Sequence, residues 1–301
     1  MQTKKRLVGA HVSSAGGHDK AVERAAAIGC NCVQVFSGSP RGWQRPDIAA
    51  IDTDKITAKR KELSVSPIFT HALYLINVTA DKPEIVAKSV STLQKELEFD
   101  GHIGGAGVVV HLGSHLGNGW DAVKDDLVTR LKQILEASPS TSTLLIENSA
   151  GQQGKLSSDL VEIRWVFDQL EKSGGFVSAG RLGWCFDTCH AWAAGYYFGE
   201  TAPDVTAEAK NPVRGRADQV ISDLNLWPML KLIHINDSRD PFGSGRDRHE
   251  NIGEGSIPLA DLKSFLNLEP VKNIPLVTEV PGFAGEGPDA KNIEKIWSML
   301  D

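Results

Sequence analysis

Histidine and acidic residues recur in this sequence at positions where they could bind a metal ion. The apolar pair Leu232 and Ile233 is followed by His234, and a glycine-rich loop then leads to Asp247 and His249. Asp247 and His249 are two residues apart, so their side chains lie on one face wherever the backbone is extended. Two imidazoles and a carboxylate suit a borderline cation such as Zn²⁺. Taken alone, the same residues also suit a hydrogen-bonded strand end and a solvated turn.

Further residues of this kind stand directly after apolar runs along the chain. The six residues that follow such runs are His71, His111, Glu147, Asp187, His234 and Glu279. With His190, Asp247 and His249 they make nine donors, of which five are histidines and four are carboxylates. Capping of neighbouring helices accounts for one or two of these residues, but not for the whole set. A catalytic Zn²⁺ takes about four ligands, water included, so nine protein donors suit two or three ions.

The apolar runs predict parallel β-strands that are buried on both faces, because the runs are continuous rather than alternating. Eight runs share this pattern, at residues 7–9, 32–36, 68–70, 107–110, 143–146, 182–186, 231–233 and 274–278. Seven or eight amphipathic helices alternate with them. We therefore predict an α/β fold with a single domain over residues 1–301, a (β/α)₈ TIM barrel, with an open doubly wound sheet as the alternative. In such a barrel the active site lies at the carboxyl ends of the strands, where the metal site is expected.

The helices are predicted from apolar residues that recur on one face. They lie near residues 17–28, 52–63, 83–99, 216–225 and 258–266. Two more are indicated by the apolar series Val123, Leu127, Leu131 and Ile134, and Leu160, Ile163, Phe167 and Leu170. Asp289 can cap the last helix, in which Ile293 and Ile296 face inward. The segment 199–214 lacks periodicity, so we predict a surface excursion there.

Composition limits the class of protein. Of the 301 residues, 41% are hydrophobic and 23% are charged, as is usual for a soluble globular protein. No apolar run approaches the ~20 residues needed to cross a bilayer, and no signal peptide is recognisable, so we expect a cytoplasmic protein without a membrane partner. Cys30, Cys32, Cys185 and Cys189 lack C-x-x-C spacing and are expected to be buried free thiols.

The net charge of −6 disfavours a nucleic-acid partner, because such partners usually call for a basic face. Bound ions can reverse the local field, however. Three divalent ions against four carboxylates would give the predicted site a formal charge of about +2. Such a site suits a phosphodiester, because divalent ions roughly 3.5–4 Å apart can hold the phosphate and activate water. The acidic composition therefore does not exclude a nucleic-acid substrate.

Longer motifs surround most of the nine donors. They are G-A-H-V-S-x-A-G-G at 9–17, H-x-x-Y-L-I-N at 71–77, H-x-G-S-H at 111–115, I-E-N-x-A-G-Q at 146–152, D-T-C-H-A-x-A-A-G-Y at 187–196, H-x-N-D at 234–237, D-R-H-x-x-I-G-E-G at 247–255 and T-E at 278–279. With these motifs the chain resembles, nearly end to end, the endonuclease IV (deoxyribonuclease IV) family of zinc-dependent apurinic/apyrimidinic endonucleases. The motifs at 187–196 and 247–255 are highly specific to that family.

The resemblance implies three zinc ions and a role for each donor. Zn²⁺ would be the ion at all three sites, with Mn²⁺ possible at one. The ligand sets, in which Glu147 bridges two ions, would be His71, His111 and Glu147; Glu147, Asp187, His234 and Glu279; and His190, Asp247 and His249, the last set reaching its ion from loops. A metal-bridging hydroxide would attack the phosphorus 5′ to an abasic sugar and leave a 3′-hydroxyl. Glu147 would be catalytic, because it would also orient that nucleophile.

The resemblance also implies the substrate, which would be double-stranded DNA with abasic sites or blocked 3′ ends, met at the nucleoid without an obligate protein partner. Members of the family insert loop side chains into DNA, and the matching positions are Arg41, Trp43 and Tyr74. An arginine and two aromatic residues can fill a gap in the base stack. An ordinary exposed loop with a partly buried tryptophan is the alternative. The loop at 37–40 departs from the family because it lacks a Lys-Asn pair.

Four histidines stand outside the nine donors. His11 ends the first strand, and we expect it to support a ligand or a phosphate rather than to bind metal itself. His18, His102 and His115 are expected to be surface or loop residues.

Two other functions are compatible with parts of the sequence. A sugar isomerase or epimerase on a related barrel would also use strand-end histidines and carboxylates. It would need one or two ions, and it would have no use for Asp247 and His249. A protein that binds DNA lesions without cutting them is the second alternative, and the presence of Glu147 argues against it.

Overall fold

Eight parallel strands form the centre of the protein and close on themselves. The computed structural model describes residues 6–152 and 154–301. The barrel strands are β1 (Val8–His11), β2 (Cys32–Phe36), β3 (Ile68–His71), β4 (Val108–Val110), β5 (Leu144–Glu147), β6 (Leu182–Asp187), β9 (Leu230–His234) and β12 (Leu276–Thr278). Their order is β1-β12-β9-β6-β5-β4-β3-β2, and β1 pairs with both β2 and β12. This closure confirms the predicted barrel and excludes the open doubly wound sheet.

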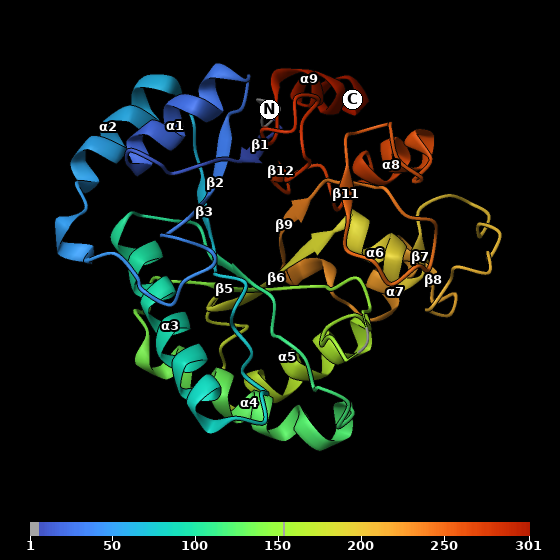
Figure 1. Ribbon diagram of the computed structural model, residues 1–301, viewed down its shortest axis with the longest axis horizontal. Coiled ribbons are helices and arrows are strands. Elements are labelled where there is room, and N and C mark those ends of the chain that lie inside the picture. Colours follow the sequence, from blue (N-terminus) through green and yellow to red (C-terminus); the bar gives the residue numbers. More distant parts are fainter. Residues whose placement is uncertain (1–5, 153) are drawn as a thin grey trace.

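Helices surround the barrel (Figure 1). Within the described residues they are α1 (His18–Ala27), α2 (Thr53–Leu63), α3 (Pro83–His102), α4 (Trp120–Ala137), α5 (Leu160–Gly174), α6 (Thr188–Ala194), α7 (Ala217–Asp223), α8 (Leu259–Leu266) and α9 (Ala290–Met299), with short 3₁₀ turns η1 (Ile48–Ala50) and η2 (Trp227–Met229). The predicted bounds hold to within two residues, except that α3 continues three residues beyond 99. Helix α6 was not predicted.

The barrel interior contains one layer of buried hydrophobic side chains. Seven strands each contribute one buried residue, and these are Cys32, Phe69, Val109, Leu145, Cys185, Leu232 and Val277. The eighth strand, β1, has Gly9 here, because a Cβ at this position would lie 2.4 Å from the carbonyl oxygen of Cys32. All four cysteines are buried and unpaired, as predicted.

A second core, the outer core, lies between the barrel and its helices. The predicted apolar faces of α4 and α5 are buried in it, for example Leu127 and Leu131 of α4 and Phe167 of α5. Burial of each such side chain contributes roughly 1.5–3 kcal/mol. Asp289 caps α9 as predicted, because its side chain accepts a hydrogen bond from the backbone N–H of Asn292.

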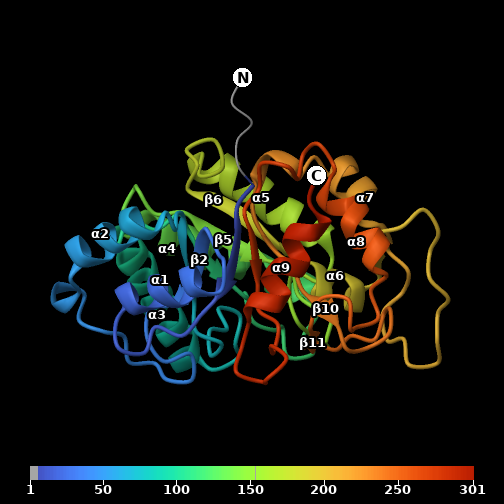
Figure 2. The same ribbon diagram turned by 90° about the horizontal axis from the view of Figure 1, so that it is seen from above.

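The loops at one end of the barrel carry two small sheets. One pairs β10 (Asp237–Ser238) with β11 (His249–Glu250), and the other pairs β7 (Tyr196–Tyr197) with β8 (Gly215–Arg216). The predicted excursion at 199–214 is an irregular loop that projects from the barrel (Figure 2). The C-terminal part of this loop is held in place because the N–H groups of Lys210 and Asn211 both donate to the carbonyl of Gly243. In the described part of the chain, every helix is too short or too polar to cross a membrane.

Candidate metal centre

The candidate site is a ring of polar side chains at the carboxyl ends of the barrel strands. On every strand, the ring residue lies two positions after the residue that belongs to the interior layer. On β1 the position in the layer is that of Gly9. Successive side chains of a strand alternate between its faces, so residues two apart point the same way. The residues of this ring are His11, Gln34, His71, His111, Glu147, Asp187, His234 and Glu279. Six of these eight are predicted metal ligands, and the closed barrel brings them together.

The other three predicted ligands come from segments that follow the strands. His190 lies in α6, so its placement on a loop was wrong. The side chain of Asp187 caps this helix, and accepts a hydrogen bond of 2.7 Å from the backbone N–H of His190. Asp247 lies in the loop before β11, and His249 begins that strand. The Oδ1 atom of Asp247 is 3.0 Å from His190 Nε2 and 3.5 Å from His249 Nε2.

Glu147 is the centre of the ring, and its side chain is fully buried. Its Oε2 atom lies 3.3 Å from His71 Nε2 and 3.2 Å from His111 Nε2. Its Oε1 atom lies 3.0 Å from His234 Nδ1 and 3.3 Å from His190 Nδ1. One carboxylate therefore faces four imidazoles, two at each oxygen, which is a geometry in which it can bridge two cations.

The donors fall into groups that could each hold an ion. Within each group, one ligand atom per residue lies within 4.8 Å of the others, and the groups are His71, His111 and Glu147; Glu147, Asp187, His234 and Glu279; His190, Asp247 and His249; and Asp187, Cys189 and His249. The first three are the ligand sets that the family resemblance implies. The structure brings these residues together, and their role as ligands stays a prediction.

The hydrogen bonds of the imidazoles test whether cations fit. His71 Nδ1 donates to the adjacent backbone carbonyl over 2.7 Å, and His190 Nδ1 donates to the carbonyl of Asn148 over 3.0 Å. In neutral imidazoles the Nε2 atoms then carry lone pairs, which face carboxylate oxygens of Glu147 and Asp247 at 3.3 and 3.0 Å. Glu147 Oε2 and His190 Nε2 are buried without a hydrogen-bond partner. A cation between each pair of acceptors would satisfy both atoms, so the residues fit metal ions.

Burial and the neighbouring carboxylates shift the pKa values of two predicted ligands, His190 and His111, in opposite directions. Burial lowers the pKa of His190, but the carboxylates of Asp187 and Asp247 outweigh this effect and raise its pKa well above the ordinary value. Burial lowers the pKa of His111 to about 4, so this imidazole is neutral and has a lone pair to offer at neutral pH. Imidazole nitrogens with carboxylate oxygens are the donor set that zinc accepts.

Gln34 is a buried amide that was not predicted from the sequence to belong to the site. Its Nε2 donates to Glu279 Oε1 over 2.8 Å, and its Oε1 accepts from His234 Nε2, also over 2.8 Å. His234 therefore presents the lone pair of Nδ1 to Glu147 at 3.0 Å. His11 Nδ1 lies 2.7 Å from the same oxygen of Glu279, so His11 contacts a predicted ligand, as expected.

Two asparagines orient Asp187, and neither was predicted from the sequence. Asn236 Nδ2 donates to Asp187 Oδ2 over 2.7 Å, and Asn236 Oδ1 accepts from the backbone N–H of Glu279 over 2.8 Å. Asn148 Oδ1 accepts from the backbone N–H of Asp187 over 2.7 Å. Each asparagine stands within two residues of a strand-end donor and inside a quoted motif, which is the signal that could have identified it.

The remaining histidines lie outside this network. His18 belongs to α1, where it is half-buried and its Nε2 donates to the carbonyl of Phe36 over 3.2 Å, so its assignment to a surface or loop was wrong. His102 ends α3 at the surface, and His115 lies in the loop after β4.

The predicted DNA-contact residues lie at the same end of the barrel. Arg41 is exposed, and Trp43 is half-buried against the outer core. Tyr74 is 56% exposed, and its backbone N–H donates to the carbonyl of Pro40 over 3.3 Å. Its ring centroid is 5.6 Å from that of His71. This places Tyr74 between the predicted metal site and the loop of Arg41, and contact with DNA stays a prediction.

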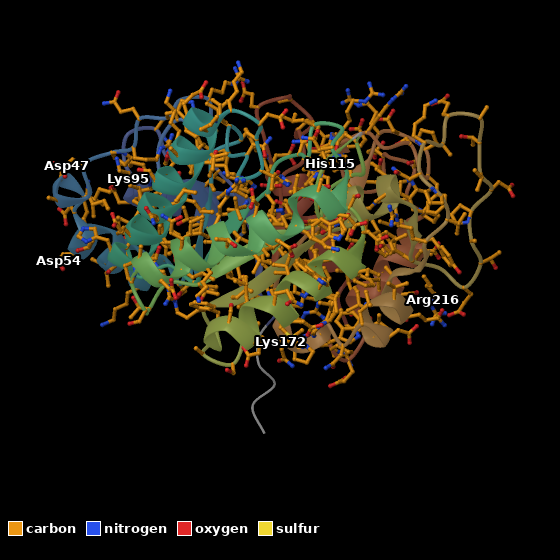
Figure 3. All side chains as sticks on the ribbon, turned by 90° about the horizontal axis from the view of Figure 1, so that it is seen from below. Asp47, Asp54, Lys95, His115, Lys172 and Arg216 are labelled. Carbon is orange, nitrogen blue, oxygen red and sulfur yellow. The ribbon has the colours of Figure 1, made fainter. Side chains whose placement is uncertain are left out.

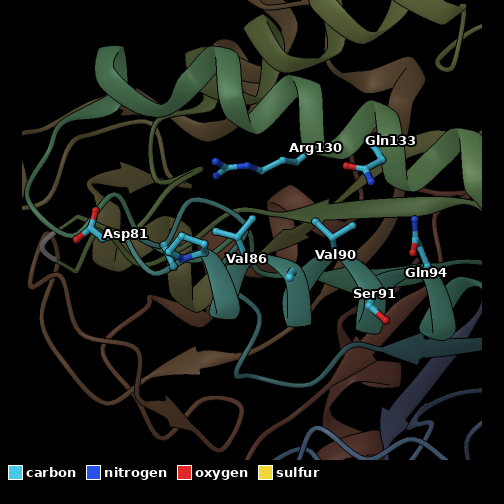
Figure 4. Close-up of a pocket in the computed structure, with 10 residues that line it drawn as sticks. Asp81, Val86, Val90, Ser91, Gln94, Arg130 and Gln133 are labelled. Atoms are coloured by element: carbon cyan, nitrogen blue, oxygen red, sulfur yellow. The ribbon is translucent and has the colours of Figure 1, made fainter.

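Recesses open directly above the ring. The smallest has a volume of about 300 Å³ and is lined by Tyr74 and six of the nine predicted ligands. Tyr74 also lines two neighbouring recesses of about 320 and 750 Å³. The pocket in Figure 4, of about 540 Å³, lies elsewhere, between α3 and α4 beside Arg130 and Gln133, and its lining includes none of the predicted ligands. The recesses above the ring make the predicted site accessible from solvent.

Relatives match this chain in sequence over nearly its whole length. A protein described as "Probable endonuclease 4" from Methanoculleus marisnigri is 36% identical over 294 residues, covering 97% of this chain and 98% of the relative. A second protein of that description, from Halothermothrix orenii, is 33% identical over 284 residues, covering 94% and 96%.

Solved structures have the same fold. Endonuclease IV from Thermus thermophilus matches with a TM-score of 0.75 and 29% identity, covering 97% of this chain and 98% of that one. A 3-keto-D-glucoside 4-epimerase from E. coli matches with a TM-score of 0.65 at 12% identity, covering 98% of this chain and 99% of that one, a likeness of fold alone. A profile of the family described as "Xylose isomerase-like TIM barrel" matches residues 22–300. Within that large group of barrels, this chain belongs to the endonuclease IV family.

Proposed function

We propose that this protein is a DNA-repair endonuclease that hydrolyses the phosphodiester bond 5′ to an abasic site, leaves a 3′-hydroxyl, and also clears blocked 3′ ends. The observation that carries the proposal is the cluster of three neighbouring donor groups, two of which share Glu147. Full-length similarity to proteins described as probable endonuclease 4, and to a solved endonuclease IV, supports it. Because its substrate is chromosomal DNA, we propose that the protein acts in the cytoplasm at the nucleoid.

The donor cluster fits three Zn²⁺ ions, with Mn²⁺ acceptable at one site. The three ligand sets are His71, His111 and Glu147; Glu147, Asp187, His234 and Glu279; and His190, Asp247 and His249. When bound, such ions would supply Lewis acidity and positive charge at the scissile phosphate.

Glu147 is the proposed catalytic residue. Both of its oxygens are fixed among imidazoles at 3.0–3.3 Å, and its side chain is fully buried. A carboxylate held in this way can orient an attacking water toward phosphorus without reorganisation during the reaction. Tyr74 forms part of the wall above it, so a phosphate that enters the recess passes this side chain.

We propose that three side chains contact DNA, namely Arg41, Trp43 and Tyr74. Arg41 and Tyr74 are exposed at the end of the barrel that carries the predicted site. A guanidinium and an exposed phenol ring can fill the gap that an abasic nucleotide leaves in the base stack. Trp43 packs half-buried against the outer core, so it supports the loop as well as offering an edge to DNA.

A sugar isomerase or epimerase is the alternative function on a barrel of this type. Such an enzyme needs one or two ions and leaves the group of His190, Asp247 and His249 without a role. About three zinc ions per chain by elemental analysis would favour the endonuclease. A single Mn²⁺ or Mg²⁺ per chain, together with conversion of a sugar, would favour the isomerase.

The decisive experiment is incision of a duplex that contains one abasic site, without added Mg²⁺. We expect cleavage 5′ to the abasic sugar, and loss of cleavage after prolonged chelation. Glu147→Gln should abolish incision while the protein stays folded, whereas the matched control Glu136→Gln, on the exposed surface of α4, should cut like the wild type. Full activity of Glu147→Gln would refute its role, and an intact wild-type holoprotein that binds but never cuts would refute the proposed function.

A further inference from the structure

The loop after β2, at residues 37–44, carries Arg41 and Trp43 with few hydrogen bonds of its own. These residues form no helix or strand. Among the described residues, the one bond between this segment's backbone and another backbone group runs from Tyr74 N–H to the carbonyl of Pro40, over 3.3 Å. Segments with so few backbone hydrogen bonds open readily unless something else holds them.

The side chain of Arg45 supplies hydrogen bonds along this loop. Its Nη1 donates to Ser37 Oγ over 3.1 Å. Its Nη2 donates to the carbonyl of Ser39 over 2.6 Å and to the carbonyl of Gly42. One guanidinium therefore ties the beginning, the middle and the end of the loop together, on both sides of Arg41.

Glu96 anchors this guanidinium to the scaffold. Arg45 Nη1 lies 3.0 Å from Glu96 Oε1, and the two side chains are only 4% and 0% exposed. Glu96 belongs to α3, which packs against the barrel through Leu93 and Leu97. Figure 3 shows Asp47, just beyond the loop, and Lys95 of α3 near each other at one edge of the protein, and both line one recess beside Arg45. The loop is thus attached to a long helix through a buried ion pair.

We propose that Arg45 is a positioning residue, which holds the loop at 37–44 in one shape so that Arg41 and Trp43 meet DNA already ordered. The inference rests on the proposed function, because only that function gives Arg41 and Trp43 a DNA partner. A loop that is ordered before binding loses less conformational freedom on binding and therefore binds more tightly. Lysine cannot replace Arg45, because an ammonium is a point donor and lacks the planar fork that reaches several acceptors at once.

Two variants test this inference without leaving a buried charge unpaired. Arg45→Lys keeps a positive charge beside Glu96. The double variant Arg45→Met with Glu96→Leu removes both charges together, because a buried ion pair can often be replaced by apolar residues without loss of stability. The matched control is Arg164→Lys in the ion pair with Asp168 on the surface of α5.

The measurements are hydrogen exchange of the amides at 37–44 in the zinc-loaded protein, and kcat and KM for the abasic duplex. We expect both Arg45 variants to exchange these amides about tenfold faster and to raise KM about tenfold, which corresponds to one lost charge-assisted hydrogen bond. Their kcat should stay within about twofold, because the groups that touch the phosphate are unchanged. The Arg164→Lys control should match the wild type in every measurement.

Three outcomes would overturn the inference. Unchanged exchange at 37–44 in both Arg45 variants would show that the guanidinium does not hold the loop. Faster exchange with an unchanged KM, in a wild-type protein that does cut abasic DNA, would show that loop order does not matter for the substrate. Absence of any incision by the zinc-loaded wild type would refute the proposed function, and the DNA part of this inference with it.

Discussion

Replacement of Gln34 by leucine should loosen metal binding without touching a predicted ligand. Gln34 is fully buried, and its amide joins His234 Nε2 to Glu279 Oε1 through two hydrogen bonds of 2.8 Å each. Without the amide oxygen, His234 loses the partner that keeps its proton on Nε2 and its lone pair toward Glu147. Without the amide N–H, Glu279 keeps only His11 as a side-chain partner at Oε1. Loss of such supporting partners typically costs 10–100-fold in metal affinity, so we expect a fall of roughly that size.

The assay is competition for Zn²⁺ against a chelator of known affinity, at fixed pH and with zinc content measured before and after. We expect the Gln34→Leu protein to release one ion earlier than the wild type, namely the one predicted for His234 and Glu279. The matched control is Gln133→Leu on the exposed side of α4, in the pocket of Figure 4, which should release zinc like the wild type. Zinc affinities of Gln34→Leu and wild type within about twofold of each other would refute the assigned role of the amide.

Three further predictions concern stability. Burial raises the pKa of Asp100 to about 7 from 3.8, so ionisation of this carboxyl group destabilises the fold as the pH rises through that range. The difference in unfolding free energy between Asp100→Asn and wild type should therefore grow in favour of the variant, by up to about 4 kcal/mol, from about pH 4 to about pH 8. Urea titrations at each pH measure this difference. Leu131→Ala, in the outer core, should lose about 2–5 kcal/mol in the same titrations. Chelation of the wild type should lower Tm and added zinc should restore it, because an ion that binds only the folded state stabilises that state.

Each of these predictions has a result that contradicts it. A difference between Asp100→Asn and wild type that does not change with pH would mean that this carboxyl group is not held in its neutral form. A loss below about 1 kcal/mol for Leu131→Ala would mean that the site collapses around the smaller side chain. A Tm that is the same with and without chelator would mean that the donor cluster does not bind ions in the folded protein.

The barrel could be predicted from the sequence because its signals are local and repeated. Each strand is a continuous apolar run, and most helices show an apolar face with the helical period. Helix α6 escaped prediction because all seven of its residues are buried, so it has no polar face against which a period could be seen. This is also why His190 was expected on a loop, although its place directly after a strand was clear.

The candidate site could be predicted in part because barrel closure turns positions in the sequence into neighbours in space. The six strand-end donors needed no knowledge of side-chain contacts, since the carboxyl ends of parallel strands meet at one end of the barrel. Asp247 and His249 were recognised from their spacing and from the resemblance. The hydrogen bonds of Asn148 and Asn236 could not be predicted, because a single sequence does not show which acceptor an amide faces.

Gln34 shows what a stricter use of the strand period would have found, and the same step accounts for His11, which was already expected to support the site. Each barrel strand contributes one residue to the interior layer, and the residue two positions later points the same way. Applied to β2, this step leads from Cys32 to Gln34, and applied to β1 it leads from Gly9 to His11. Both residues therefore belong to the same ring as the six strand-end donors, although neither is a predicted ligand. The ring has eight members because the barrel has eight strands, and the two members without a ligand role are the ones that hydrogen-bond to Glu279. The fold thus supplies six of the nine predicted ligands and two of their supports by one rule, which makes Gln34 and His11 part of the site rather than of the barrel core.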